Sequence, residues 1–182
     1  MVRQKALERE ERDWRERMDT KPKLDTYKRW KLKLEYEPYL NIRDSSSRRA
    51  LTELRSGTHR LRIETGRWER IPVHPSVSNG HVSSRSLRRS ERICPMCFGG
   101  VESEMHFLLD CPMYDDQREV LLAELKQVEP WVASALEKHT NRTEIGIERR
   151  FEALRWLAQD KTILLVAQFI RNCNRIRRSF NN

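Results

Sequence analysis

The sequence predicts a mainly α fold: a helical domain that carries a small zinc knuckle, made of a short β-ribbon and a short helix, in its middle. Several segments repeat apolar residues at steps of three and four, which is the spacing of one helix face. Three of the four cysteines and one histidine fall within residues 94–111, in a spacing that suits a metal. Charged residues make up 35% of the 182 residues, which favours solvated helices and irregular segments around a modest core.

Residues 1–20 are predicted to form a polar helical extension. Acidic residues precede basic ones by four positions, as in Glu11 and Arg15, and such pairs stabilise a solvated helix. The apolar residues of this helix are few: Leu7, Trp14 and Met18. Two interpretations follow, a solvated extension and a helix that docks on a protein partner.

The rest of the chain, residues 21–182, is predicted to be one helical domain. Its first helix begins at about Pro22, because proline suits the first helical turn, and runs to about Glu35. The apolar face of this helix comprises Leu24, Tyr27, Trp30 and Leu34. The next helix begins after Asp44, which offers a capping carboxylate, and ends near Gly57. One face of that helix holds Ala50, Leu51 and Leu54, and the other holds Arg48, Arg49 and Arg55.

Between this helix and the knuckle the sequence changes character twice. Residues 61–68 alternate apolar and polar side chains, which predicts a ribbon-like segment with a glycine turn. Residues 72–90 are rich in serine and arginine and poor in large apolar groups, so we predict a flexible loop. This loop is either a passive insertion, or an arm that contacts phosphate, or a target of phosphorylation.

Helices are predicted again after the knuckle. One begins at Pro112 and has acidic residues in its early turns, where they complement the helix dipole. Its apolar face comprises Tyr114, Leu121, Leu125 and Val128. A helix over about residues 144–158 follows, and Asp160 caps the last one. The apolar face of this last helix comprises Ile163, Val166, Ala167, Ile170 and Cys173, and its end carries Arg171, Arg175, Arg177 and Arg178. Those arginines suit both a helix C-terminus and a phosphate site, and both interpretations stay open.

The knuckle, residues 92–114, is the one constellation that carries recognisable chemistry. Its candidate ligands are Cys94, Cys97, His106 and Cys111, in the spacing C-x2-C-x8-H-x4-C. Thiolates and imidazole are the ligands that zinc prefers, and four of them close a tetrahedral shell with no open position. We therefore predict one structural zinc ion. The alternative is that two of these cysteines are buried thiols and the histidine lies on the surface, and Cys173 is expected to be a core thiol.

The charge of the chain favours a polyanionic partner. The formal net charge is +9, and residues 44–93 hold eleven basic and five acidic side chains. The cysteine-rich stretch is locally acidic, so it is not expected to be the main phosphate contact.

Several classes of protein are excluded. Only six glycines are present and none forms a phosphate loop, and motifs of hydrolases and metalloproteases are absent. Tyr114-Asp115-Asp116 superficially resembles the aspartate pair of polymerases, but it lacks the intervening residue and lies where a helix start favours acids. The longest apolar run, residues 163–170, is too short to span a bilayer, and the charged start of the chain is no signal peptide. We expect a protein of the nucleus or cytoplasm that is not an enzyme and has no membrane partner.

The chain also resembles a known family. The segments that carry the likeness are Ala50–His59, Ile63–Trp68, Arg92–Cys97 and Val101–Tyr114, together with Lys23–Tyr27 and Glu37–Leu40. They are similar to the zinc-binding C-terminal region of reverse transcriptases of LINE-type, non-LTR retrotransposons, over about residues 21–119 and loosely over 144–178. The resemblance implies a module that helps bind template RNA or target DNA, with the four knuckle ligands at the family's CCHC positions. The polymerase and endonuclease domains of that family are absent from this sequence, so reverse transcription is not implied, and residues 72–90 look like an insertion.

The leading hypothesis is therefore a non-catalytic, zinc-stabilised module that binds RNA or DNA through basic residues around the knuckle. The candidate contacts are Arg48, Arg49, Arg55, Arg62, Arg67, Trp68 and Arg70. The indole of Trp68 either stacks on an unpaired base or packs in the core. The competing hypothesis is a structural or protein-interaction remnant of a retroelement, whose positive charge is incidental.

Overall fold

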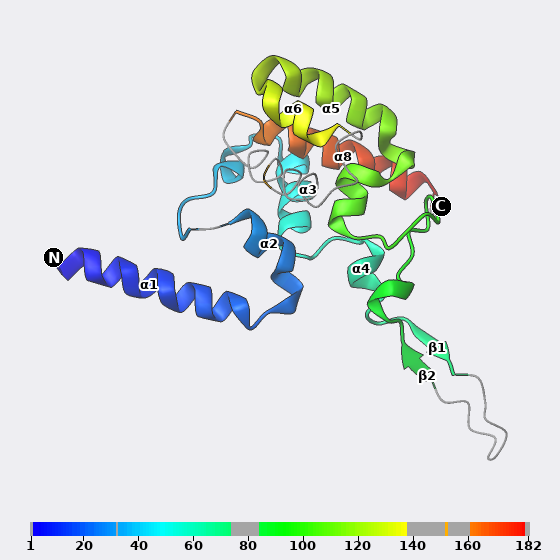
Figure 1. Cartoon of the computed structure of the whole chain (residues 1–182), viewed down its shortest axis with the longest axis horizontal. Helices are drawn as coiled ribbons and strands as arrows, with labels where there is room; N and C mark the ends of the chain where they lie inside the picture. Colours follow the sequence, from blue (N-terminus) through cyan, green and yellow to red (C-terminus); the bar gives the residue numbers. More distant parts are fainter. Residues whose placement is uncertain (1, 32, 74–83, 138–151, 153–160, 181–182) are drawn as a thin grey trace.

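The computed structural model describes residues 2–31, 33–73, 84–137, 152 and 161–180, and it confirms the mainly α fold class (Figure 1). Its α-helices are α1 (Val2–Asp19), α2 (Asp25–Trp30), α3 (Ser45–Arg55), α4 (Arg62–Thr65), α5 (Asp115–Val128), α6 (Pro130–Leu136) and α8 (Ile163–Phe180). Shorter helical turns are η1 (Pro22–Leu24), η2 (Pro38–Asn41), η3 (Arg89–Glu91), η4 (His106–Asp110) and η5 (Pro112–Tyr114). A small antiparallel ribbon joins β1 (Arg70–Pro72) to β2 (Ser84–Ser86).

The core of the molecule lies between α3, α5, α6 and α8. Helix α8 packs against α3 and α5, and α6 packs against α5 (Figure 1). The predicted apolar face of the last helix is confirmed, since Ile163, Val166, Ala167, Ile170 and Cys173 are all buried. The predicted face of α5 is confirmed for Tyr114, Leu121 and Leu125, whereas Val128 is exposed at the end of that helix. The predicted helix over 144–158 and the cap Asp160 lie outside the described residues, apart from Glu152.

Helix α3 begins and ends at the predicted signals. The side chain of Asp44 accepts hydrogen bonds from the backbone N–H groups of Ser46 and Ser47, which caps the helix N-terminus. Gly57, just past the C-terminus, has a φ of 64°, and a Cβ there would lie 2.8 Å from the carbonyl oxygen of Lys23. Glycine is therefore required both by the left-handed backbone and by the close approach of a neighbouring segment.

The helix predicted from Pro22 to Glu35 is shorter than expected. It ends at Trp30, and Lys31 adopts an extended backbone. The ammonium group of Lys31 donates to the carbonyl of Glu35 at 2.6 Å and pairs with the carboxylate of Glu37 at 2.7 Å. These contacts turn the chain back on the helix and leave Leu34, a predicted core residue, exposed.

The prediction of a ribbon over residues 61–68 is wrong, because the helix α4 forms there. The backbone N–H of Arg62 donates to the carboxylate of Glu102 at 2.5 Å, and the N–H of Ile63 donates to the Glu102 carbonyl at 3.1 Å. A residue forty positions away thus satisfies the N–H groups that a helix start leaves free.

The antiparallel ribbon forms instead where residues 70–72 pair with part of the segment predicted to be a flexible loop, residues 72–90. Residues 84–90 form β2 and part of η3, and residues 74–83 are outside the described part. Arg85 fixes the base of this ribbon through two bonds to Glu91, at 2.5 and 2.6 Å.

Two elements project from the helical body on different sides, α1 and the ribbon (Figure 1). Helix α1 has exposed polar side chains over most of its length, and Met18 is buried near its C-terminal end. None of the helices in the described ranges is long and apolar enough to cross a membrane.

Candidate metal centre and arginine-rich surface

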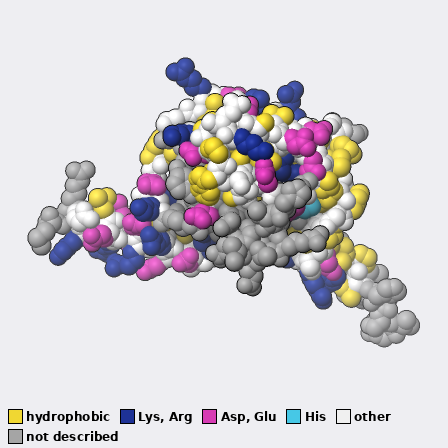
Figure 2. Space-filling view, turned by 45° about the horizontal axis from the view of Figure 1, so that its top comes forward, with side chains coloured by type: hydrophobic (Ala, Val, Ile, Leu, Met, Phe, Trp, Pro, Cys, Tyr) yellow, Lys and Arg dark blue, Asp and Glu magenta, His cyan; other side chains and the backbone are white. Residues whose placement is uncertain are grey.

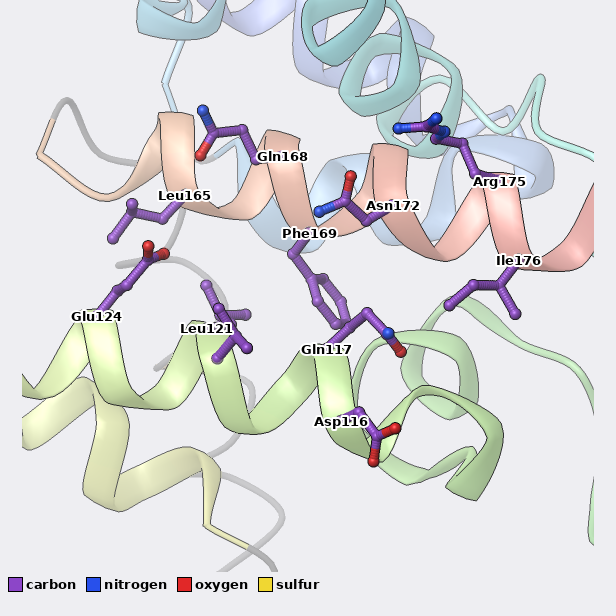
Figure 3. Close-up of a pocket in the computed structure, with 11 residues that line it drawn as sticks. Asp116, Gln117, Leu121, Glu124, Leu165, Gln168, Phe169, Asn172, Arg175 and Ile176 are labelled. Carbon is purple, nitrogen blue, oxygen red and sulfur yellow. The ribbon is translucent and has the colours of Figure 1, made fainter.

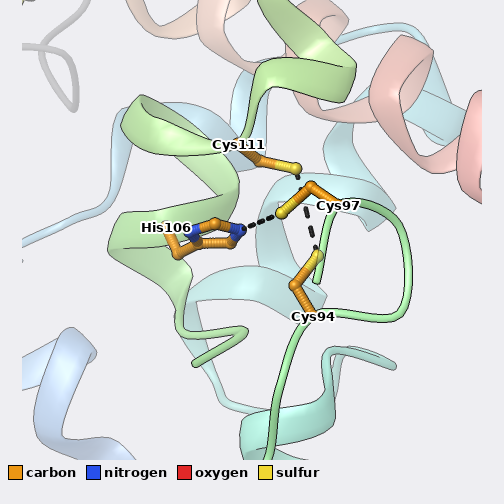
Figure 4. A group of neighbouring side chains, drawn as sticks. All are labelled: Cys94, Cys97, His106 and Cys111. Atoms are coloured by element: carbon orange, nitrogen blue, oxygen red, sulfur yellow. Dashed lines mark hydrogen bonds between the residues drawn. The ribbon is translucent and has the colours of Figure 1, made fainter. Parts of the chain in front are cut away.

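The first two candidate ligands lie on a tight hairpin. Its strands meet at the bridge between Ile93 and Val101, and the backbone N–H of Cys94 donates to the carbonyl of Gly100 at 2.8 Å. Inside this hairpin the N–H of Phe98 returns to the carbonyl of Cys94 at 2.9 Å. This turn brings the side chains of Cys94 and Cys97 to the same side of the hairpin (Figure 4).

The other two ligands lie at the two ends of η4. This element is π-helical, and the N–H of Cys111 donates to the carbonyl of His106, five residues earlier, at 2.7 Å. A π-helical turn inserts an extra residue and is often found at functional sites. Here it places the imidazole and the fourth sulfur on the side of the helix that faces the hairpin (Figure 4).

The structure brings all four predicted ligands together. Their donor atoms lie within 4.8 Å of one another. The Cys97 sulfur is 3.3 Å from Nε2 of His106, and the sulfurs of Cys94 and Cys111 are 3.9 Å apart (Figure 4). A tetrahedral ion with metal–sulfur bonds of about 2.3 Å has sulfur–sulfur edges of about 3.8 Å. The four residues can therefore hold a metal ion, as their spacing predicts.

Burial sets the protonation of these ligands before a metal binds. Burial raises the pKa of Cys94, and it raises the pKa of Cys111 to about 12. Burial also lowers the pKa of His106, so the imidazole is neutral and its lone pair can bind a metal. A metal that binds near neutral pH therefore displaces the protons of the two buried thiols.

A buried arginine of α5 supports the second ligand pair. Arg118 donates to the carbonyl of Cys111 at 2.9 Å and to the carbonyl of Leu108 at 3.0 Å, and it also pairs with Asp115. These bonds hold the last turn of η4 in place. These bonds were not predicted, because nothing in the sequence distinguishes Arg118 from the other charged residues of a solvated helix.

A buried carboxylate supports the first ligand pair. Glu102 is 1% exposed, and its Oε1 lies 3.8 Å from the sulfur of Cys94. Burial raises the pKa of Glu102, while Arg177 and the Arg62 N–H act in the opposite direction. The partners of Glu102, Arg62 and Arg177, lie too far away in sequence to be found from a local pattern.

Among the predicted nucleic-acid contacts on α3, Arg55 is the one that the structure contradicts. It is 2% exposed and pairs with Glu37 at 2.7 Å, so it cannot reach a ligand. Arg48 is half-buried and donates to the carbonyl of Ile42 at 2.6 Å. Arg49 is exposed but pairs with Glu53 at 2.7 Å. The second face of α3 is thus not the open arginine face that the sequence predicts.

The predicted contacts around α4 lie on the surface. The interpretation of Trp68 as a core residue is wrong, because this indole is 84% exposed. Arg62 pairs with Glu69 at 2.6 Å and Arg67 with Glu64 at 2.7 Å, and both arginines are partly exposed. Arg70 is exposed and donates to the hydroxyl of Ser84 across the ribbon at 3.3 Å.

Three more arginines join this surface at the base of the ribbon. Arg88 and Arg89 are exposed, and Arg92 donates to the carbonyl of Ile63 at 2.7 Å. Burial lowers the pKa of Arg92, and the nearby charges of Arg67 and Arg89 lower it further. The guanidinium groups therefore gather in one place, and Figure 2 shows Lys and Arg side chains at the base of the projecting ribbon. Arg88 and Arg89 belong to the segment predicted as a flexible loop, for which an arm that contacts phosphate was one interpretation, and Arg92 was not predicted as a contact.

The turn of the knuckle exposes an aromatic side chain that was also missed. Phe98 is 78% exposed and has a φ of 55°, in the left-handed region that L-residues other than Asn and Asp rarely adopt.

A hollow of about 470 Å³ lies away from this centre, between α5 and α8 (Figure 3). Asp116 and Leu121 line it from α5, and Phe169, Arg175 and Ile176 line it from α8. No cysteine or histidine lines it among the described residues, and it does not contain the candidate ligands.

Comparison with known proteins adds no assignment to this geometry. No family model, no curated protein and no solved structure matches the chain.

Proposed function

We propose that this protein is a non-catalytic nucleic-acid-binding module whose fold is stabilised by one structural zinc ion. The proposal has two parts, an ion held by Cys94, Cys97, His106 and Cys111 and a binding surface of arginines and one indole at the base of the ribbon. It agrees with the resemblance to the C-terminal region of retrotransposon reverse transcriptases. Such a module would act in the nucleus or the cytoplasm.

Zinc is the metal that this set of donors favours. Three thiolates and one imidazole are borderline-soft ligands, and a tetrahedral shell of this kind is typical of zinc and of iron–sulfur sites. A single ion with one imidazole ligand favours zinc over a cluster. Because four protein ligands fill the coordination shell, the ion would be structural. Zinc binds small knuckles with an apparent free energy of about 10–16 kcal/mol, and this free energy would stabilise the folded state.

The observation that carries the nucleic-acid part is the exposure of Trp68 on the same surface as three exposed arginines. Arg70, Arg88 and Arg89 make no ion pair within the described part of the chain. Guanidinium groups grip phosphate oxygens, and an exposed indole stacks on an unpaired base. The indole of Trp68 is 84% exposed and is therefore accessible to a base.

The test is a titration with a fluorescent single-stranded RNA and the matching DNA. Replacing Trp68 with Ala removes a stacking contact worth about 1–3 kcal/mol, so affinity should fall about 5- to 150-fold. The matched control is Phe180→Ala, an exposed aromatic residue at the end of α8, which should leave affinity unchanged.

The arginines are tested by the salt dependence of the same titration. Each phosphate contact on a single strand contributes about −0.7 to the slope of log affinity against log salt. Replacing Arg70, Arg88 and Arg89 with Gln should therefore make this slope shallower by about 2. Replacing three exposed arginines of α1, Arg9, Arg12 and Arg15, should change it less.

A second function, a structural or protein-interaction remnant, is favoured by one observation. Arg49, Arg62 and Arg67 each pair with a glutamate, which reduces the free positive charge. Under this alternative, neither the Trp68 variant nor the arginine variant changes the affinity for RNA or DNA. That outcome would reject the nucleic-acid part and leave the zinc part standing.

A further inference from the structure

The turn of the knuckle hairpin carries a phenyl ring that lies mostly outside the fold. Phe98 is 78% exposed, and among the described residues other than glycine it alone has a positive φ, at 55°. Glycine adopts this backbone conformation at lower cost than phenylalanine. Residues held in such a conformation cluster at functional sites, where the side chain is needed in that position.

Hydrogen bonds fix the backbone on which this ring stands. The N–H of Phe98 donates to the carbonyl of Cys94 at 2.9 Å, and the N–H of Cys94 donates to the carbonyl of Gly100 at 2.8 Å. On a fixed backbone, only the two side-chain angles of an aromatic residue remain to be ordered when it binds a ligand. The hairpin therefore presents the ring as a platform that is largely ordered in advance.

The hairpin itself is uncharged. Residues 93–101 contain no acidic and no basic side chain. The first acidic residue after them, Glu102, is 1% exposed and pairs with Arg177 at 2.8 Å. Stacking, rather than phosphate binding, is therefore the contact that the hairpin offers to a nucleic acid.

Arg92 joins the hairpin to the surface that carries Trp68. The side chain of Arg92 packs on Gly66, where a Cβ would lie 2.9 Å from its Cγ, and Gly66 precedes Trp68 by two residues. Two residues and the hydrogen bond from the Phe98 N–H to Cys94 connect Arg92 to Phe98, so their Cα atoms are no more than about 14 Å apart. This distance corresponds to about four stacked nucleotides of one strand.

We propose that Phe98 is a second base-stacking residue of the nucleic-acid surface, and that Phe98 and Trp68 hold unpaired bases of one single strand. This inference rests on the proposed function and names its substrate class, a single strand rather than a duplex. Every unpaired base offers a face on which an aromatic ring stacks, whereas the bases of a duplex are already stacked on one another. The arginines of the surface bind phosphates of either form.

The experiment measures the affinity of the full chain, at a fixed zinc concentration, for a fluorescent single strand of about twelve nucleotides, as RNA and as DNA, and for the duplex of the same sequence. Phe98→Gly should lower the affinity for the single strand about 5- to 150-fold and leave the affinity for the duplex unchanged. The same variant should raise the urea midpoint, because glycine adopts the backbone without strain, so a loss of binding would not come from unfolding.

Two further substitutions and a control separate stacking from other effects. Phe98→Tyr keeps an aromatic ring and should retain the affinity of the wild type, whereas Phe98→Leu keeps apolar bulk alone and should lose affinity as Phe98→Gly does. The matched control is Tyr36→Ala, an exposed aromatic residue before η2, which should bind as the wild type does.

The outcomes separate this inference from the proposed function. If the wild type binds no nucleic acid, the proposed function is refuted, and Phe98 has no base to hold. If Trp68→Ala weakens binding and Phe98→Gly does not, the proposed function stands and the inference is overturned, and the exposed ring then indicates a protein partner. If Phe98→Gly weakens single-strand and duplex binding equally, the ring does not act by stacking, which also overturns the inference. If Phe98→Gly does not fold, the comparison of Phe98→Leu with Phe98→Tyr decides.

Discussion

Replacing Arg55 with Ala should destabilise the fold strongly, because this guanidinium is the centre of a buried cluster. Its Cζ lies 5.6 Å from the ring centroid of Tyr27, 5.5 Å from that of Trp30 and 5.1 Å from that of Tyr39. The same group pairs with Glu37 at 2.7 Å. Three aromatic rings and one carboxylate thus enclose a cation that is 2% exposed.

The magnitude follows from what remains after the substitution. Removing one partner of a buried ion pair costs about 3–5 kcal/mol, because the other charge is left without compensation. Glu37 keeps a second partner, the ammonium group of Lys31 at 2.7 Å, which places the loss at the lower end. We expect the free energy of unfolding to fall by about 3 kcal/mol, or the melting temperature by about 6–12 °C.

Urea unfolding followed by circular dichroism, at a fixed zinc concentration, measures this loss. The matched control is Arg49→Ala on the same helix, whose ion pair is exposed and should contribute less than about 1 kcal/mol. The reasoning is refuted if Arg55→Ala costs less than about 1 kcal/mol or no more than Arg49→Ala.

Three further predictions concern single features. Phe98→Gly should raise the free energy of unfolding, measured in urea, by about 0.5–1 kcal/mol, because glycine adopts the φ of 55° without strain. A lower free energy of unfolding would show that the aromatic ring of Phe98 packs in solution. Cys173→Ala should leave the zinc content unchanged in elemental analysis, since this thiol is buried in the core and is not among the four ligands; a loss of metal would reject that role. In metal-free protein, burial raises the pKa of Cys173 to about 12 from an ordinary value of 9.0, so the neutral thiol favours the folded state. That contribution is fully present below about pH 9 and is lost as pH rises toward 12, so the urea midpoint should fall over this range, and a constant midpoint would contradict it.

The sequence predicts well those elements whose signals are local. Helix α3 carries its own cap at Asp44 and its own stop at Gly57, and both act as expected. The apolar face of α8 is buried along its length for the same reason. The metal ligands are also local, since Cys94 and Cys111 lie on one hairpin and the helix that follows it.

The elements that differ from the prediction depend on distant partners. The segment predicted as a ribbon becomes α4 because Glu102 satisfies its first N–H groups. The helix expected to reach Glu35 ends at Trp30 because Lys31 turns toward Glu37. No pattern within either segment contains these contacts, so only the packed chain reveals them.

The exposure of residues on the candidate binding surface also depends on distant partners. The sequence predicts that Arg55 lies on the exposed face of an amphipathic helix. In the structure, its aromatic partners on α2 and η2 bury it. The sequence favours a buried position for Trp68 over a base-stacking one, and its exposure follows from the turn between α4 and β1. Arg118 donates to the carbonyl of Cys111 and Arg177 to the carboxylate of Glu102, and only the tertiary structure brings these partners near.

The most direct test of the account is the zinc content of freshly purified, reduced protein, measured by elemental analysis beside a Cys111→Ser variant. The account predicts one zinc ion for each wild-type chain and a large loss of zinc in the variant, because the variant removes one of four ligands from a closed shell. A wild-type chain that carries no zinc, or a variant that retains it fully, would contradict the central claim.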